Sequence, residues 1–106
     1  MGAYIYINGM INCEPHLSQD VTLLFKDVPA EDEFWHRNGD EDYLFSLSVR
    51  ESRYHLLMEC FNQIAKVKTQ DSVLNEWYFV DGLATLNHED QDRIELLRFR
   101  GGLIES

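Results

Sequence analysis

The segment from about Ser52 to Lys68 constrains the fold of this chain more than any other part of the sequence. Its apolar residues recur at the i, i+3, i+4 and i+7 spacing of an amphipathic α-helix and cover roughly half of the helix circumference. A helix with so wide an apolar side is expected to pack on a sheet. Ser48 and Glu51 fit a capping box at its start, and Ser52 is an alternative cap. The apolar residues are Tyr54, Leu56, Leu57, Met58, Cys60, Phe61, Ile64, Ala65 and Val67.

β-Branched and aromatic segments supply candidate strands for this sheet. Residues 43–49 alternate cleanly and predict a half-buried strand. Residues 21–25 predict a further strand, since three apolar side chains share one face under an alternating pattern. The residues predicted to face inward are Tyr43, Phe45, Leu47 and Val49 in the first segment, and Val21, Leu23 and Phe25 in the second.

Two hairpins with type I′ turns are predicted, one at Asn8–Gly9 and one at Asp81–Gly82, because these pairs favour positive φ. Their arms are residues 3–7 and 10–12 in the first hairpin, and 77–80 and 83–86 in the second. The tyrosines of these arms lie either on an exposed sheet face or at the edge of the core; they are Tyr4, Tyr6 and Tyr78.

The C-terminal segment carries helix signals, but its apolar residues do not form a helical stripe. We therefore expect a short turn at residues 89–92 and then a strand, with Ile94 and Leu96 on one face and Leu97 and Phe99 on the other. Together these elements predict one α+β domain over residues 1–106. It would consist of a mainly antiparallel sheet of five or six strands with one long amphipathic helix, at about residues 52–68, packed on one face.

Charge limits the classes of partner. Nineteen acidic residues against nine basic ones give a net charge of −10. Such a field repels nucleic acids and anionic membrane surfaces and attracts basic proteins, although acidity also serves solubility alone. No apolar run approaches the ~20 residues that span a bilayer. The absence of a secretory signal, and the presence of only two cysteines, favour a cytoplasmic protein. A Cys13–Cys60 bridge is the alternative to two free thiols.

Motifs for metals and catalysis are incomplete. Asn38-x-Asp40-x-Asp42 imitates the opening of an EF-hand loop, but the glycine and glutamate that the loop requires are missing. Cys13-x-x-His16 has the spacing of half a zinc site, and no second pair follows. The chain contains no nucleophile elbow, zinc-protease motif or phosphate-binding loop. We therefore expect neither a metal nor a cofactor, and no enzymatic activity.

Residues 27–42 predict a loop, because Pro29 and the Asn38–Gly39 pair interrupt regular structure, with one short helical turn at residues 30–35 as a further option. Two aromatic residues in this segment lie between runs of acidic residues. Interfaces use this combination, in which rings anchor and charges steer; the alternative is that the rings pin the loop onto the core. The predicted partner-binding residues are Asp27, Glu31, Asp32, Glu33, Phe34, Trp35, Asp40, Glu41, Asp42 and Tyr43.

The expected function is that of an acidic inhibitor of a basic protein. Its concrete form is an immunity protein that neutralises a bacterial nuclease or RNase toxin by docking on or near the active site. One alternative is a DNA mimic that blocks a DNA-processing enzyme, and another is a small enzyme whose site the sequence does not reveal.

Overall fold

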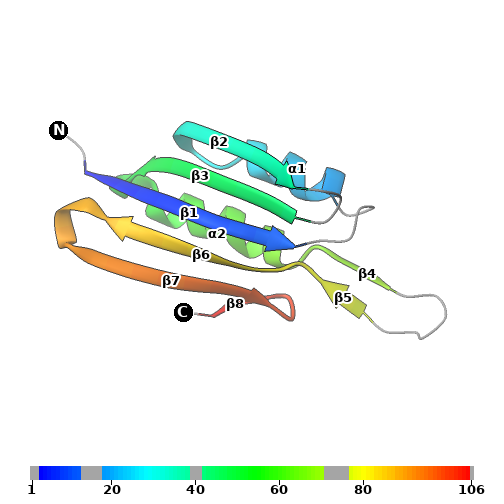
Figure 1. Cartoon of the computed structure of the whole chain (residues 1–106). Helices are drawn as coiled ribbons and strands as arrows, with labels where there is room; N and C mark the ends of the chain where they lie inside the picture. The colour runs from blue at the N-terminus through cyan, green and yellow to red at the C-terminus, as the bar shows by residue number, and fades with distance from the viewer. Residues whose placement is uncertain (1–2, 13–17, 39–41, 71–76, 106) are drawn as a thin grey trace.

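The computed structural model describes residues 3–12, 18–38, 42–70 and 77–105, and the side chains of residues 18–19, 33–38, 68–70 and 77–78 are outside the description. The chain forms one six-stranded antiparallel sheet in the order β2-β3-β1-β6-β7-β8, with helices α1 and α2 on one face and a separate two-stranded sheet, β4-β5, beyond one end (Figure 1). The elements are β1 (Tyr4–Asn12), α1 (Ser18–Lys26), β2 (Ala30–Asn38), β3 (Asp42–Arg50), the 3-10 turn η2 (Glu51–Arg53), α2 (Tyr54–Ala65), β4 (Lys68–Gln70), β5 (Trp77–Phe79), β6 (Asp81–His88), the 3-10 turn η3 (Glu89–Gln91), β7 (Arg93–Arg100) and β8 (Leu103–Glu105).

The predicted α+β class and the antiparallel sheet covered by an amphipathic helix are therefore confirmed. The first four strands of the order, with α1 and α2, follow the β-α-β-β-α-β connectivity of a split βαβ unit. In that connectivity β3 lies between β1 and β2, and both connecting helices come to lie on the same face. The sheet therefore has one face under helices and one face without them.

The core lies between the sheet and the two helices. Alternate residues of β3 point into it, as the alternating sequence pattern predicted: Tyr43, Phe45, Leu47 and Val49 are all buried. From α2, Leu57, Phe61, Ile64 and Ala65 are buried against them. The ring of Phe61 lies 6.2 Å from that of Phe45 and 5.5 Å from that of Phe99. Edge-on packing of these rings joins the helix to two strands, β3 and β7.

The long helix is shorter than predicted and is not capped as predicted. Helical structure runs from Glu51 to Ala65, with its first turn in the 3-10 form. The residues that precede the two helical segments are Arg50 and Arg53, and neither makes a side-chain capping hydrogen bond. Ser48 lies within β3 instead. The helix begins directly where the strand ends, so the chain has no loop in which a capping box is formed.

Residues 21–25 are helical rather than extended. In α1, Val21 and Phe25 are buried and Leu23 is 52% exposed. Val21 and Phe25 are four residues apart, a spacing that fits one side of a helix as well as one side of a strand. The alternating interpretation was wrong because it placed Leu23 in the core, and the structure contains a second helix that the sequence did not indicate.

Both predicted type I′ turns are absent, because each turn pair lies inside a strand. Asn8 and Gly9 belong to the central strand β1, where Asn8 pairs with Ser46 on one side and Thr85 on the other. Asp81 and Gly82 begin β6. The partner of β5 is β4, whereas the predicted hairpin would have paired β5 with β6. A strand in the middle of a sheet forms hydrogen bonds along both edges, which outweighs the local preference of an Asn-Gly or Asp-Gly pair for a turn.

Gly82 has a packing role rather than a turn role. A Cβ atom at this position would lie 2.2 Å from the carbonyl oxygen of Met10 and 2.9 Å from the Cα atom of Ile11. The backbones of β6 and β1 therefore approach so closely here that only glycine fits.

The C-terminal prediction is confirmed. η3 covers Glu89–Gln91, Asp92 adopts the left-handed conformation, and β7 follows. Leu97 and Phe99 are buried, whereas Ile94 and Leu96 are exposed on the opposite face.

The predicted loop at residues 27–42 is largely an edge strand. β2 occupies residues 30–38 and pairs with β3 along one side only, with a register irregularity between Ala30 and Asp32. Charged side chains are typical of edge strands, where they oppose unwanted strand pairing. The acidic composition and Pro29 therefore fit an edge as well as a loop, and this is why the sequence interpretation was wrong.

Candidate functional site

The sheet face that the helices leave uncovered carries most of the large exposed apolar side chains. Four strands contribute to its centre: β3, β1, β6 and β7. Met10 lies between Leu44 and Leu83 in the sheet register, and Arg98 of β7 is opposite Leu83. Leu96 and Ile94 lie further along β7, opposite Thr85 and Asn87. The apolar side chains among these are all more than a third exposed, up to 72% for Ile94. Asp81 and Arg98 also face this side, at its margin. We call the uncharged central part of this side the open face: Tyr6, Asn8, Met10, Leu44, Ser46, Ser48, Leu83, Thr85, Asn87, Ile94 and Leu96.

The eleven residues of the open face are uncharged, in a chain of which 26% is charged, and the charges on this side of the sheet lie at the margin. Its polar members are neutral side chains, and some bond to one another: Ser46 Oγ donates to Asn8 Oδ1 at 2.9 Å, and Thr85 Oγ1 donates to the Asn8 carbonyl oxygen at 3.3 Å. Depletion of charge together with exposed Met, Leu and Tyr is typical of the centre of a protein–protein interface. The open face therefore has the composition of a contact surface.

Charged groups border the open face at both ends. At one end, Glu31 accepts hydrogen bonds from the Tyr4 hydroxyl and from Arg50 Nε. These two bonds hold the pKa of the Glu31 carboxyl below its usual value, and the Glu31 hydrogen bond raises the pKa of Tyr4. At the other end, Asn12 Nδ2 donates to the Asp42 carboxylate at 2.7 Å. The centre is thus neutral, with apolar residues on both sides of the polar row Ser46–Asn8–Thr85, and its border is charged or polar.

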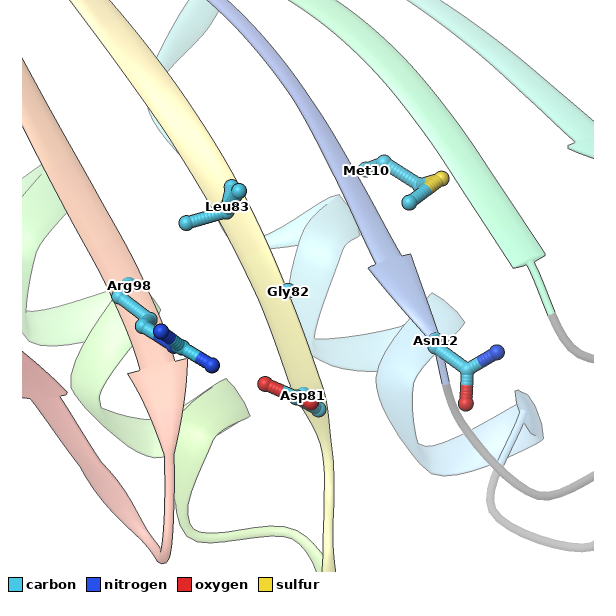
Figure 2. A pocket seen from close by; sticks show the side chains of 6 residues that line it. All are labelled: Met10, Asn12, Asp81, Gly82, Leu83 and Arg98. Carbon is cyan, nitrogen blue, oxygen red and sulfur yellow. The ribbon is translucent and has the colours of Figure 1, made fainter.

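A shallow hollow of about 240 Å³ lies at one margin of the open face. Met10, Asn12, Asp81, Gly82, Leu83 and Arg98 line it. Figure 2 shows Met10 extending toward β3 and Leu83 toward β7, so that the strip of backbone between them at Gly82 stays open. The same view shows the side chains of Asp81 and Arg98 extending toward one another. The hollow therefore combines apolar walls with one acidic and one basic group.

A second cluster of ionisable groups is centred on His88, the one polar residue that is fully buried among those described. His88 Nδ1 lies 3.0 Å from Glu51 Oε1, and His88 Nε2 lies 3.3 Å from both Glu95 Oε1 and Arg93 Nη2. The Tyr54 hydroxyl donates to both Glu95 oxygens, at 2.9 and 3.0 Å. Partial burial, and then this hydrogen bond, raise the pKa of Tyr54 to about 12.

Histidine–carboxylate pairs serve in general acid–base catalysis when a substrate reaches the imidazole. The imidazole of His88 has no exposed surface, and its ring packs 5.6 Å from that of Tyr54. The arrangement instead ties η2 and α2 to β6 and β7 with satisfied polar contacts. Sequence reasoning missed this cluster, because Glu51 and His88 are 37 positions apart and only the fold brings them together.

Those predicted partner-binding residues whose side chains the structure describes do not form one patch. Glu31 and Asp32 are exposed near the start of β2, whereas Asp42 begins β3 at the opposite end of that hairpin, and Asp27 is exposed just after α1. Eight residues of strand separate the two ends, a distance of roughly 25 Å. Their roles in partner binding stay predictions.

Tyr43 faces the core. Its ring is 7% exposed and its hydroxyl lies 3.1 Å from Thr22 Oγ1. This removes the ring from any contact surface, as the inward alternation of β3 requires. Glu33, Phe34 and Trp35 lie in β2, where only the backbone is described, and Asp40 and Glu41 lie outside the described residues.

The candidate metal and thiol sites are largely outside the described part of the chain, which includes neither Cys13 nor His16 nor Asp40. Among the residues that are described, no group of three or more His, Cys, Asp or Glu side chains is placed to hold a metal ion. Cys60 is a free thiol, and burial raises its pKa. In the same described residues, neither helix has the length and hydropathy to cross a bilayer.

Comparison of the chain with protein-family models, with curated proteins and with solved structures found no match in any of the three. The interpretation of the site therefore depends on its own geometry and chemistry.

Proposed function

We propose that this protein binds and inhibits a basic protein, as an immunity protein neutralises a nuclease or RNase toxin, and that the open face is its contact surface. The observation that carries the proposal is the uncharged, partly apolar open face on a chain with a net charge of −10. A surface of this kind is costly to leave in water unless a partner covers it.

The size of the open face supports this role. Four strands spaced ~4.8 Å apart, over ~20 Å of strand length, give a central area of about 380 Å². A stable interface buries about 800 Å² on each partner. The open face therefore supplies an uncharged, partly apolar centre of about half that area, and the charged border completes it.

The charge of the whole molecule supports a basic partner. The excess of ten negative charges accelerates the approach of a basic protein, while the neutral open face avoids the cost of desolvating ions at the centre of the contact. A DNA mimic has less support, because it would present carboxylates where phosphates lie, and the open face has none. In this proposal the protein acts in the cytoplasm, a compartment that keeps thiols such as Cys60 reduced.

The test is a pull-down from lysate of the source cells, with bound proteins identified by mass spectrometry. Leu83→Glu places a charge in the open face. Leu23→Glu is the matched control, because Leu23 is exposed to a similar extent but lies on α1, on the other side of the sheet. We expect wild type and Leu23→Glu to retain the same basic protein and Leu83→Glu to lose it.

Equal retention by all three proteins would show that the open face is not the contact surface. Retention of many DNA-processing proteins, at low salt only, would favour the DNA-mimic alternative. A purified partner, once identified, allows the same comparison by calorimetry and a direct assay of nuclease inhibition.

A further inference from the structure

The hollow at the margin of the open face has a chemistry that differs from the rest of that face. Its walls are the aliphatic side chains of Met10 and Leu83, and between them the backbone at Gly82 is uncovered (Figure 2). Its third side carries Asp81, the first residue of β6, and Arg98 of β7. The floor belongs to two adjacent strands of a central sheet, so its shape is largely fixed before a partner arrives.

The two charged groups of the hollow are available to a ligand. Asp81 and Arg98 are both exposed, and neither forms a hydrogen bond or an ion pair within 4 Å with any residue whose side chain the structure describes. Glu105 lies opposite Arg98 in the β7–β8 register, and it too forms no such pair with Arg98. The hollow therefore offers a free carboxylate acceptor beside a free guanidinium donor.

This combination selects a neutral ligand group. A basic side chain would be attracted by Asp81 and repelled by Arg98. An acidic side chain would be repelled by Asp81 and attracted by Arg98. A neutral hydroxyl satisfies both groups, because its O–H donates to the carboxylate while its oxygen accepts from the guanidinium. The aliphatic walls and the exposed backbone at Gly82 suit a flat ring, and a hollow of about 240 Å³ has room for one.

We propose that this hollow receives the phenol ring of a tyrosine side chain from the partner protein, with its hydroxyl between Asp81 and Arg98. This inference depends on the proposed function, since it names the anchor residue of that interaction. Buried tyrosines surrounded by apolar contacts are frequent hot spots of protein–protein interfaces.

The experiment uses small probes, so that it does not require the partner. The full chain, labelled with ¹⁵N, is titrated with p-cresol, with toluene and with n-propylguanidinium, and amide shifts are followed by NMR. We expect p-cresol to shift the amides around Gly82 and Arg98 saturably, with a dissociation constant on the order of millimolar. It should bind about fivefold more tightly than toluene, because toluene leaves both polar groups of the hollow without a partner.

The matched variants are Arg98→Met and Arg100→Met. Arg100 lies on the same strand two residues further along and does not line the hollow. Arg98→Met should weaken p-cresol binding about fivefold, and Arg100→Met should leave it unchanged.

Tighter binding of n-propylguanidinium than of p-cresol, shifts spread over the surface, or an equal effect of the two arginine variants would overturn the inference. Failure of p-cresol to bind, together with capture of a basic protein that Leu83→Glu abolishes, would reject the tyrosine anchor and leave the proposed function intact. Localised p-cresol binding without capture of any basic protein would reject the proposed function and leave the hollow as a binding site for a phenol ring.

Discussion

Removal of the Tyr54 hydroxyl should destabilise the protein by an amount that depends on pH. This hydroxyl donates to both oxygens of Glu95, and Glu95 in turn lies 3.3 Å from the buried His88. Tyr54→Phe removes the donor and leaves a partly buried carboxylate with fewer partners. Loss of one hydrogen bond to a charged group costs about 1.5–3 kcal/mol when the site is buried.

The raised pKa of Tyr54 gives the size of the pH-dependent part of this effect. A rise from 10.0 to about 12 corresponds to about 2.7 kcal/mol between the protonated and ionised forms. We halve this to about 1.3 kcal/mol, because Tyr54 is partly exposed and water screens the interaction. Because the pKa is higher in the folded state, this stability is fully present below about pH 10, and it is lost as the pH rises toward about 12.

The assay is urea unfolding of wild type and Tyr54→Phe, followed by circular dichroism at about pH 9 and about pH 11.5. The difference in free energy of unfolding should be about 1–2 kcal/mol at the lower pH and should shrink at the higher one. Tyr6→Phe is the control, since Tyr6 is exposed on the sheet and its hydroxyl has no hydrogen bond to any side chain described. A difference below about 0.3 kcal/mol at the lower pH, or an equal difference at both, would refute the reasoning.

Two further predictions concern packing. Phe61→Ala should lower the free energy of unfolding by about 3–5 kcal/mol, because the ring is fully buried against Phe45 and Phe99. Leu56→Ala, on the exposed side of the same helix, should cost less than about 1 kcal/mol, and similar losses from both would contradict the packing of α2. Gly82→Ala should cost about 1–3 kcal/mol in thermal or urea unfolding, because its Cβ would displace the β1 backbone at Met10; an unchanged stability would mean that the two strands lie further apart.

Patterns that admit only one regular structure were predicted correctly. The alternation of residues 43–49 has no helical counterpart, and the apolar side of the long helix has no strand counterpart. The two faces of β7 also followed from the sequence, because Leu97 and Phe99 alternate with charged residues.

Where a sequence pattern fits two regular structures, tertiary contacts determined which of the two the segment adopts. Val21 and Phe25 fit either period, and packing of α1 beside α2 selected the helix. Asn8–Gly9 and Asp81–Gly82 favour turns locally, but hydrogen bonds to neighbouring strands hold both pairs extended.

For the candidate site, too, one part could be predicted from the sequence and another part depends on tertiary contacts. Neutral and apolar residues alternate with apolar residues that are mostly buried along β1 and β6, and this alternation is visible in the sequence. Their assembly into one surface is not visible, because it depends on the strand order β3-β1-β6-β7, which joins segments far apart in the chain. The acidic and aromatic residues of the 27–43 segment were predicted to act together, yet of those whose side chains are described, Glu31 and Asp32 lie near one end of the β2–β3 hairpin and Asp42 lies at the other.

The sequence by itself determined the α+β class, the helix that covers the sheet, and the acidic charge from which a basic partner is proposed. These properties follow from local periodicity and from sums over the chain, neither of which requires long-range contacts. The tertiary structure alone decided which face stays open, where Asp81 and Arg98 meet beside Gly82, and how Glu51, His88 and Glu95 come together. Those juxtapositions depend on strand order and register, which are set by the packing of the whole core rather than by any segment.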